Sequence, residues 1–185
     1  MVVLDSRRFV LQWTVATSVA IALSTRNPLL SPWLVGIAQW LVLRRYHLSR
    51  SWLWIAATAI GNSVAIIVAV FSIFSVALIG RDFNVDGIAL FLFACVVVAI
   101  AIRSSLQCWI LSRYSPRYPK WIAASTAATV LGCSISVALI YIFYHSDPDL
   151  HTFRAVDALP LFLIWGLGGA IIGLMEGRSL NRILN

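Results

Sequence analysis

Apolar residues follow one another along this chain in six long stretches, separated by short polar segments that carry most of the charge. Apolar stretches of this length are typical of helices that are buried or lie in a membrane, and they exceed the length of ordinary strands. The sequence therefore predicts an all-α fold. The expected helical segments are Phe9–Ser24, Leu29–Leu43, Trp52–Gly80, Gly87–Leu111, Trp121–Phe143 and Pro160–Leu184.

The composition of the chain indicates that these helices lie in a membrane. Hydrophobic residues make up 61% of the 185 residues and charged residues only 11%, which is far from the mixture of a soluble globular protein. We therefore expect a polytopic membrane helix bundle with membrane lipids as its surroundings. The formal charge of +7 does not predict a nucleic-acid partner, because the basic residues are spread between the apolar stretches as membrane anchors are.

The first two segments are short for membrane spans. At the rise of an α-helix they reach only about 22–24 Å, against roughly 30 Å of hydrocarbon in a bilayer. We expect either that this first hairpin spans a thinned bilayer or that it is partly re-entrant and shielded by the other helices. Both alternatives return the chain to the same side of the membrane.

The beginning of the chain also fits a second interpretation. A basic head, Met1–Arg8, before an apolar run is the pattern of a signal peptide, and Ala20-Ile21-Ala22 would serve as its cleavage site. Against this, the segment that starts at Trp13 reads WTVAT and resembles two later helix openings. We therefore interpret Phe9–Ser24 as a helix of the bundle.

The distribution of charge predicts the orientation in the membrane. Basic residues concentrate in the N-terminal head, in two connections and at the C-terminus, whereas the other three connections hold five of the seven acidic residues. By the positive-inside rule, both termini and both basic connections are cytoplasmic, in a bacterial inner or thylakoid-type membrane. The basic residues on that side are Arg7, Arg8, Arg44, Arg45, Arg50, Arg113, Arg117, Lys120, Arg178 and Arg182.

The two basic connections, which we call elbows, belong to an internal repeat. The first elbow lies in GIAQWLVLRRYHLSRSWLWIAAT (36–58), and a similar order of Gln, Arg-Tyr, a basic turn and WIAAS occupies 107–125. Gln39, Gln107 and Glu176 are 68 and 69 positions apart. We interpret residues 1–185 as one membrane domain built from three helical hairpin repeats, approximately 9–43, 52–111 and 121–184. Each repeat opens at a tryptophan, namely Trp13, Trp54 or Trp121.

This arrangement resembles a class of cyanobacterial-type polytopic membrane proteins with repeated G-x-x-Q-W-L-V-L-R-R elbows, each followed by a helix that begins with Trp. Gly36–Arg45 fits the pattern closely, and Gln107–Arg113 and Gly173–Arg182 fit it loosely. The resemblance covers most of the chain. It implies the same architecture and carries no known activity with it.

Two ionisable residues, Arg103 and Glu176, lie inside apolar stretches near the predicted cytoplasmic ends of their helices. Charged groups in a membrane usually face the interior of the bundle or a partner, so we expect the two to pair, together with Gln107 one turn from Arg103. The alternatives are a proton or solute path and snorkelling of the side chains to the interface. Gln39, Gln107 and Glu176 are expected to form an intramembrane polar ring, for which ligation of a Mg-porphyrin is a further alternative.

Two other features are candidates for contacts or ligands. Gly169, Gly173 and Gly177 recur at four-residue spacing and predict a smooth helix-packing face, either against helices of the same chain or against a partner subunit. The connection His145-Ser-Asp-Pro-Asp-Leu-His151 places His and Asp at alternate positions. If it is extended, His145, Asp147, Asp149 and His151 share one face, and their chemistry is compatible with zinc; an ordinary acidic loop is the alternative.

No catalytic motif is present: there is no H-E-x-x-H, no G-x-S-x-G and no phosphate-binding glycine loop. We therefore expect no enzyme and predict no cofactor, leaving pigment or lipid open. The expected function is that of a non-enzymatic accessory or scaffold subunit, with other membrane subunits as partners. A small-solute or vitamin transporter component is the second hypothesis, and a membrane enzyme is the third.

Overall fold

The computed structural model describes residues 6–27, 30–46, 48, 50–79, 85–145 and 158–185, and within them it contains six α-helices and no strand. Each helix begins and ends within three residues of a segment expected from the sequence. The predicted all-α class and the predicted helical segments are therefore confirmed. The helices are α1 (Ser6–Ser24), α2 (Ser31–Arg45), α3 (Leu53–Ile79), α4 (Val85–Leu111), α5 (Lys120–His145) and α6 (Ala158–Leu184).

The helices differ in length, and local sequence sets some of their ends. Pro32 lies in the first turn of α2, where its fixed φ and its missing N–H cost nothing. Arg50, shortly before α3, has a φ of 57°, which is uncommon for a residue other than glycine. With 15 residues α2 is about 22 Å long, as expected. With 19 residues α1 is about 28 Å long, which is longer than the sequence suggested because the helix begins at Ser6 and not at Phe9.

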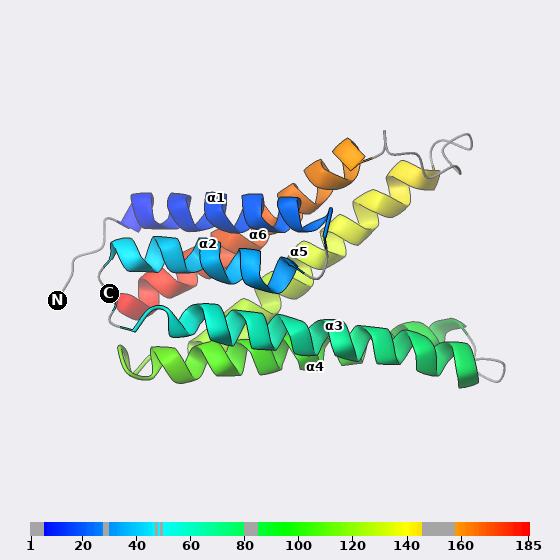
Figure 1. Cartoon of the computed structure of the whole chain (residues 1–185), viewed down its shortest axis with the longest axis horizontal. Coiled ribbons are helices and arrows are strands. Elements are labelled where there is room, and N and C mark those ends of the chain that lie inside the picture. Colours follow the sequence, from blue (N-terminus) through cyan, green and yellow to red (C-terminus); the bar gives the residue numbers. More distant parts are fainter. Residues whose placement is uncertain (1–5, 28–29, 47, 49, 80–84, 146–157) are drawn as a thin grey trace.

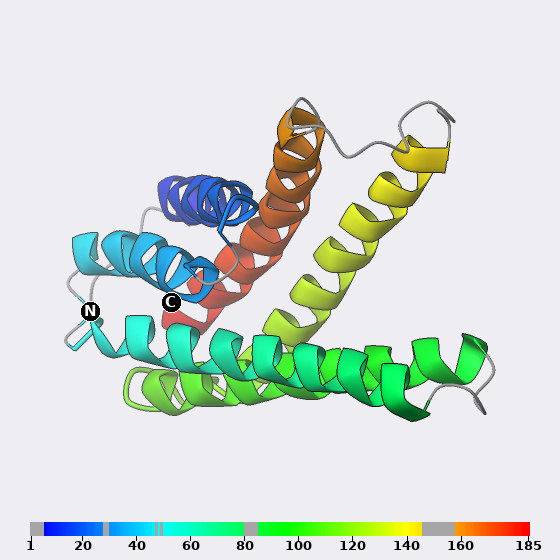
Figure 2. The same cartoon turned by 45° about the vertical axis from the view of Figure 1, so that its right-hand side comes forward.

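The six helices form a closed ring (Figure 1). Among the described residues, each helix approaches the backbone of the helix before it and of the helix after it in the chain. The first and the last helix, α1 and α6, also pack together, with the most extensive contact of all, and so close the ring. The starts of α1, α3 and α5 and the ends of α2, α4 and α6 lie together at one end of the bundle, which we call the convergent end. Figure 2 shows α5 and α6 diverging from α3 and α4 toward the opposite end.

The outer surface of the bundle is largely apolar, and its interior holds many polar side chains among apolar ones. On α1, the outward positions Leu11, Val15, Val19 and Leu23 are 50–64% exposed, at intervals of four residues. Soluble proteins normally bury such side chains and expose polar ones. Here the buried side chains include many polar ones: Thr17, Ser24, Gln39, Ser51, Thr58, Arg103, Ser104, Gln107, Ser115, Ser125, Thr129, Ser136 and Glu176.

Two helices are long and apolar enough, on the described residues, to cross a membrane. They are α5 over Lys120–Phe143 and α6 over Leu159–Leu184. In α3 and α4 the described apolar stretches are shorter, at Leu53–Val68 and Val97–Leu111. The structure thus supports a helical bundle with two helices of membrane-spanning length.

Candidate functional site: a buried polar network around three tryptophans

Three tryptophan side chains meet at the convergent end of the ring. Trp13 comes from the second turn of α1, Trp54 from the first turn of α3 and Trp121 from the first turn of α5. All three side chains are almost completely buried. The ring centroids of Trp13 and Trp54 are 5.7 Å apart, and those of Trp54 and Trp121 are 5.6 Å apart, both in edge-to-face geometry. Aromatic pairs favour this geometry, so the three rings tie the three hairpins together.

Trp54 and Trp121 each bond to a glutamine in the same way. The indole N–H of Trp54 donates to Oε1 of Gln39 at 2.9 Å, and that of Trp121 donates to Oε1 of Gln107 at 3.1 Å. Each bond joins one hairpin to the next along the chain. Each glutamine also donates from Nε2 to a threonine of its own hairpin. The acceptors are Thr17 for Gln39, at 3.3 Å, and Thr58 for Gln107, at 3.0 Å.

Glu176 occupies the corresponding position in the third hairpin. Its Oε1 accepts a hydrogen bond from the hydroxyl of Ser125 at 2.6 Å. Ser125 takes the place of the threonines in the other two hairpins, but it donates to the carboxylate, whereas the threonines accept from the amides. Oε2 of Glu176 accepts from Nε2 of Gln39 at 3.3 Å, which links the third hairpin to the first. The tryptophan equivalent to Trp54 and Trp121 is Trp13, but its buried indole nitrogen has no hydrogen-bond partner. The network therefore has three similar corners, each formed by one tryptophan and one amide or carboxylate. The corner of Trp13 and Glu176 is incomplete, because it lacks the hydrogen bond of the indole N–H.

A small residue lies three positions before Gln39, Gln107 and Glu176, and two of these residues are glycines at which neighbouring helices approach closely. A Cβ on Gly36 would lie 3.2 Å from Cα of Ile55, and one on Gly173 would lie 2.8 Å from Cα of Thr14. Ile55 directly follows Trp54, and Thr14 directly follows Trp13, each in the next hairpin around the ring. Ser104 fills the same repeat position in α4 and is fully buried, with no hydrogen-bond partner for its hydroxyl. Close backbone approach through small residues is typical of helix packing in membranes.

Arg103 departs from the pattern of three similar corners. It precedes Gln107 by four residues, and the corresponding positions before Gln39 and Glu176 hold Val35 and Ile172, which are buried apolar residues. A cation and a carboxylate thus replace residues that are neutral in the other copies. The two charged residues lie on α4 and α6, and they neutralise each other within the bundle.

The contacts of Arg103 converge on one terminal nitrogen. Nη2 donates to Oε1 of Glu176 at 2.9 Å, to Oγ1 of Thr129 at 2.8 Å and to Oγ of Ser125 at 3.1 Å. The Nε atom of the same side chain is buried without a partner. Gly61 on α3 makes room for this side chain, because a Cβ there would lie 2.5 Å from Cβ of Arg103.

Part of this network was predicted from the sequence and part was not. Arg103 and Glu176 lie together as expected, and Gln39 joins them through Glu176. Gln107 was expected beside Arg103, but its amide bonds to Thr58 and Trp121. The sequence patterns did not single out Thr17, Thr58, Ser125, Thr129 and Gly61. A signal for the first three was present, since each lies four residues after the Trp that opens its repeat.

The three glycines of α6 lie against α1. Added Cβ atoms on Gly169, Gly173 and Gly177 would meet Ser18, Thr14 and Trp13 at 2.9, 2.8 and 3.2 Å. Of the two alternatives for this face, the structure shows packing within the chain. The face is covered by α1 and is not free for a partner subunit.

The predicted metal ligands can be placed only in part. His145 is the last residue of α5, and Asp147, Asp149 and His151 lie outside the described residues. Within the described ranges, no three His, Cys, Asp or Glu side chains come together in a way that would hold a metal ion.

Comparison of the chain with known protein families, with characterised proteins and with solved structures found no match. The function of the network therefore has to be inferred from its chemistry. Its members supply hydrogen-bond donors and acceptors that mainly satisfy one another, together with one buried ion pair.

Proposed function

We propose that this chain is an integral membrane protein whose six helices all lie in the bilayer, with its termini and both elbows on the cytoplasmic side. The apolar outer surface and the burial of polar and charged side chains inside the bundle support this placement, because lipid stabilises an apolar surface and polar groups in a membrane face the interior of the bundle. The concentration of arginine at the convergent end supports the orientation.

Within that membrane, we propose that the protein is a non-enzymatic accessory or scaffold subunit of a larger complex. The observation that carries this proposal is that the amides and the carboxylate of the network are used in hydrogen bonds to one another and to neighbouring side chains. The two glutamines bond to tryptophan and threonine, and Glu176 accepts bonds from three different residues. Side chains used in this way hold helices in register. They leave few groups to act on a substrate.

The outer groove between α1 and α2 offers a place for a partner subunit. It encloses about 930 Å³ and is apolar along most of its length, with Arg44 and Arg45 among its lining residues. Because α2 is shorter than the other helices, the surface beside it is open to a neighbouring hydrophobic helix. The groove is lined from α1 by Leu11, Val15 and Val19 and from α2 by Leu34, Ile37 and Leu41, among others.

Affinity purification in a mild detergent, followed by mass spectrometry of proteins and small molecules, tests this function. We expect other membrane proteins at fixed stoichiometry. The groove variant Val19→Trp should release them, whereas Val137→Trp, at a similarly exposed position on α5, should not. A protein that purifies alone with one bound metabolite would contradict the accessory role.

A second function, that of a small-solute transporter component, is favoured by one specific observation. Arg103 and Glu176 occupy positions that are apolar or neutral in the other two repeats, so the architecture does not require charges there. Ionisable residues that a membrane fold does not need often mark a path for a solute or a proton. The unpartnered donors Trp13 Nε1 and Arg103 Nε lie in the same network and would bind acceptor atoms of such a solute.

The double variant Arg103→Val with Glu176→Gln separates the two functions, because it restores the residue types of the other repeats. An accessory subunit should keep its partners when it carries this variant. A transporter component should remain folded and lose its bound solute.

A further inference from the structure

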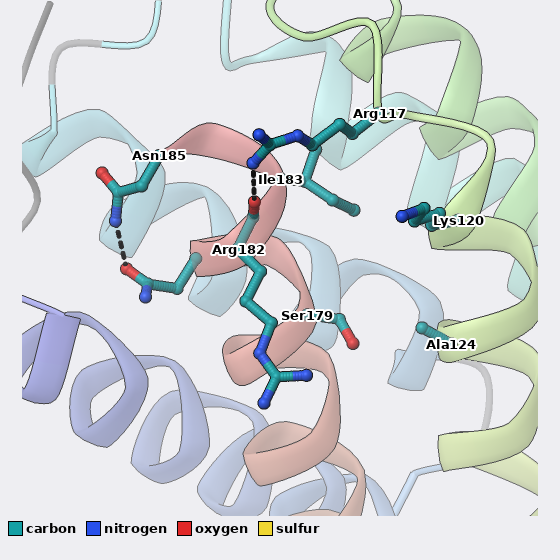
Figure 3. Close-up of a pocket in the computed structure, with 8 residues that line it drawn as sticks. Arg117, Lys120, Ala124, Ser179, Arg182, Ile183 and Asn185 are labelled. Carbon is teal, nitrogen blue, oxygen red and sulfur yellow. Dashed lines mark hydrogen bonds between the residues drawn. The ribbon is translucent and has the colours of Figure 1, made fainter.

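A basic pocket lies at the convergent end of the bundle, between the start of α5 and the end of α6. It encloses about 660 Å³, and the described residues that line it include three cationic side chains and no carboxylate side chain. The cations are Arg117 from the second elbow, Lys120 from the start of α5 and Arg182 from the last turn of α6. Figure 3 shows Lys120 and Ala124 on α5 and Ser179 and Arg182 on α6 lining opposite sides of the pocket.

One of these cations is held in place by the protein. The guanidinium of Arg117 donates to the carbonyl oxygen of Arg182 at 3.3 Å, which orients it over the end of α6. The hydroxyl of Ser115 accepts a hydrogen bond from the backbone N–H of Arg117 at 3.2 Å and so anchors the elbow. Three cations around one pocket make its potential positive, so the pocket attracts anions and favours a ligand with more than one negative charge.

The remaining lining residues define the kind of anion. Ser179, Asn181 and Asn185 supply neutral polar groups, and Ala124 and Ile183 supply an apolar wall. Arginine binds phosphate with paired N–H groups, and lysine binds it as a point charge. The volume falls in the range of about 300–1,000 Å³ that is usual for small-molecule pockets, and it exceeds what a single phosphate needs.

We propose that this pocket binds a phosphate-bearing anion, and that the headgroup of an anionic phospholipid is its source. Basic pockets between helices on the cytoplasmic side of a membrane bind such headgroups, and the apolar wall would contact the glycerol end of the lipid. The choice of a lipid rests on the membrane placement proposed above. The anion site itself rests only on the lining residues.

Native mass spectrometry of the intact purified chain tests the proposal, with phosphatidylglycerol and phosphatidylcholine as lipid probes and with inorganic pyrophosphate as a soluble probe. We expect phosphatidylglycerol to bind in preference to phosphatidylcholine. The double variant Arg117→Gln with Arg182→Gln should weaken that binding about ten-fold or more, since it removes two charge-assisted contacts. The matched control is Arg7→Gln with Arg50→Gln, which removes two exposed charges outside the pocket.

Each outcome decides the proposal. Selective loss in the pocket variant supports it, and displacement of the lipid by pyrophosphate, or binding of pyrophosphate alone, would keep the site and assign it to a soluble ligand. Equal loss in the pocket and control variants, or binding of neither anion, would overturn it. If the double variant fails to fold, Lys120→Gln compared with Arg7→Gln gives the same decision, because no protein contact of the Lys120 amine holds the fold together among those described. None of these outcomes depends on whether partner subunits co-purify.

Discussion

Arg103 and Glu176 are the charged residues that are buried in the described part of the chain, and Nη2 of Arg103 on α4 lies 2.9 Å from Oε1 of Glu176 on α6. Each of them departs from the repeat at its position, where the other copies hold Val35 and Ile172 or Gln39 and Gln107. The two departures compensate in charge, so they are coupled. Each charge would be costly to bury without the other in an interior of low dielectric.

The substitution Glu176→Gln should destabilise the bundle by about 3–5 kcal/mol, because it leaves the buried Arg103 guanidinium without a counter-charge. The double variant Arg103→Val with Glu176→Gln should recover most of the loss, since it removes both buried charges and restores the residue types that Val35 and Gln39 have at the corresponding repeat positions. Thermal unfolding in detergent, arranged as a double-mutant cycle, measures the coupling. Additive losses in the double variant would show that the two residues act independently.

Replacement by phenylalanine should lower the stability more at Trp54 than at Trp13, although both rings are almost completely buried. Trp54→Phe removes the indole donor to Gln39 and leaves a buried acceptor unpaired, with an expected loss of about 1–3 kcal/mol beyond the change in packing. Trp13→Phe removes a donor that has no partner, so the polar part of the loss should be absent. Chemical or thermal unfolding of the two variants provides the comparison. An equal effect would count against the incomplete third corner.

The glycines of α6 offer a matched pair for the close contact with α1. A methyl group at Gly173 would lie 2.8 Å from backbone Cα of Thr14, whereas the nearest atom at Gly166 is Cβ of Ala22, at 3.5 Å. Gly173→Ala should therefore cost about 1–3 kcal/mol through overlap. Gly166→Ala should be neutral, or should stabilise by up to about 1 kcal/mol through helix propensity. The melting temperatures of both variants test this, and an unchanged value for Gly173→Ala would contradict the packing.

The proposed orientation predicts which connections are accessible from the cytoplasm. In a background from which Cys95, Cys108 and Cys133 have been removed, Ser112→Cys at the second elbow should react with a membrane-impermeant maleimide only after permeabilisation. A cysteine placed at Ser146, in the connection that follows α5, should react in intact cells. Labelling in the reverse order would invert the topology, and labelling of both sites in intact cells would remove α5 from the membrane.

The repeat in the sequence carried real information about the site, but only about part of it. The recurrence of Trp, Gln or Glu and Gly at fixed spacing singled out Gln39, Gln107 and Glu176, and the structure uses all three in the network. The pairing of Gln107 with Arg103 was wrong. Spacing along one helix does not say which neighbouring helix a side chain meets, and Gln107 bonds to Thr58 and to Trp121 on the helices to either side.

The six helices, and their ends to within three residues, follow from the sequence alone, because apolar runs and turn residues act through local backbone preferences and through the choice of solvent. The packing of α1 against α6, which closes the ring and places Trp13 beside Gly177, is seen only in the folded chain. The folded chain also shows that the corner formed by Trp13 and Glu176 differs from the other two. That arrangement depends on contacts between residues more than 160 positions apart, and no local pattern records which of several similar helices will meet.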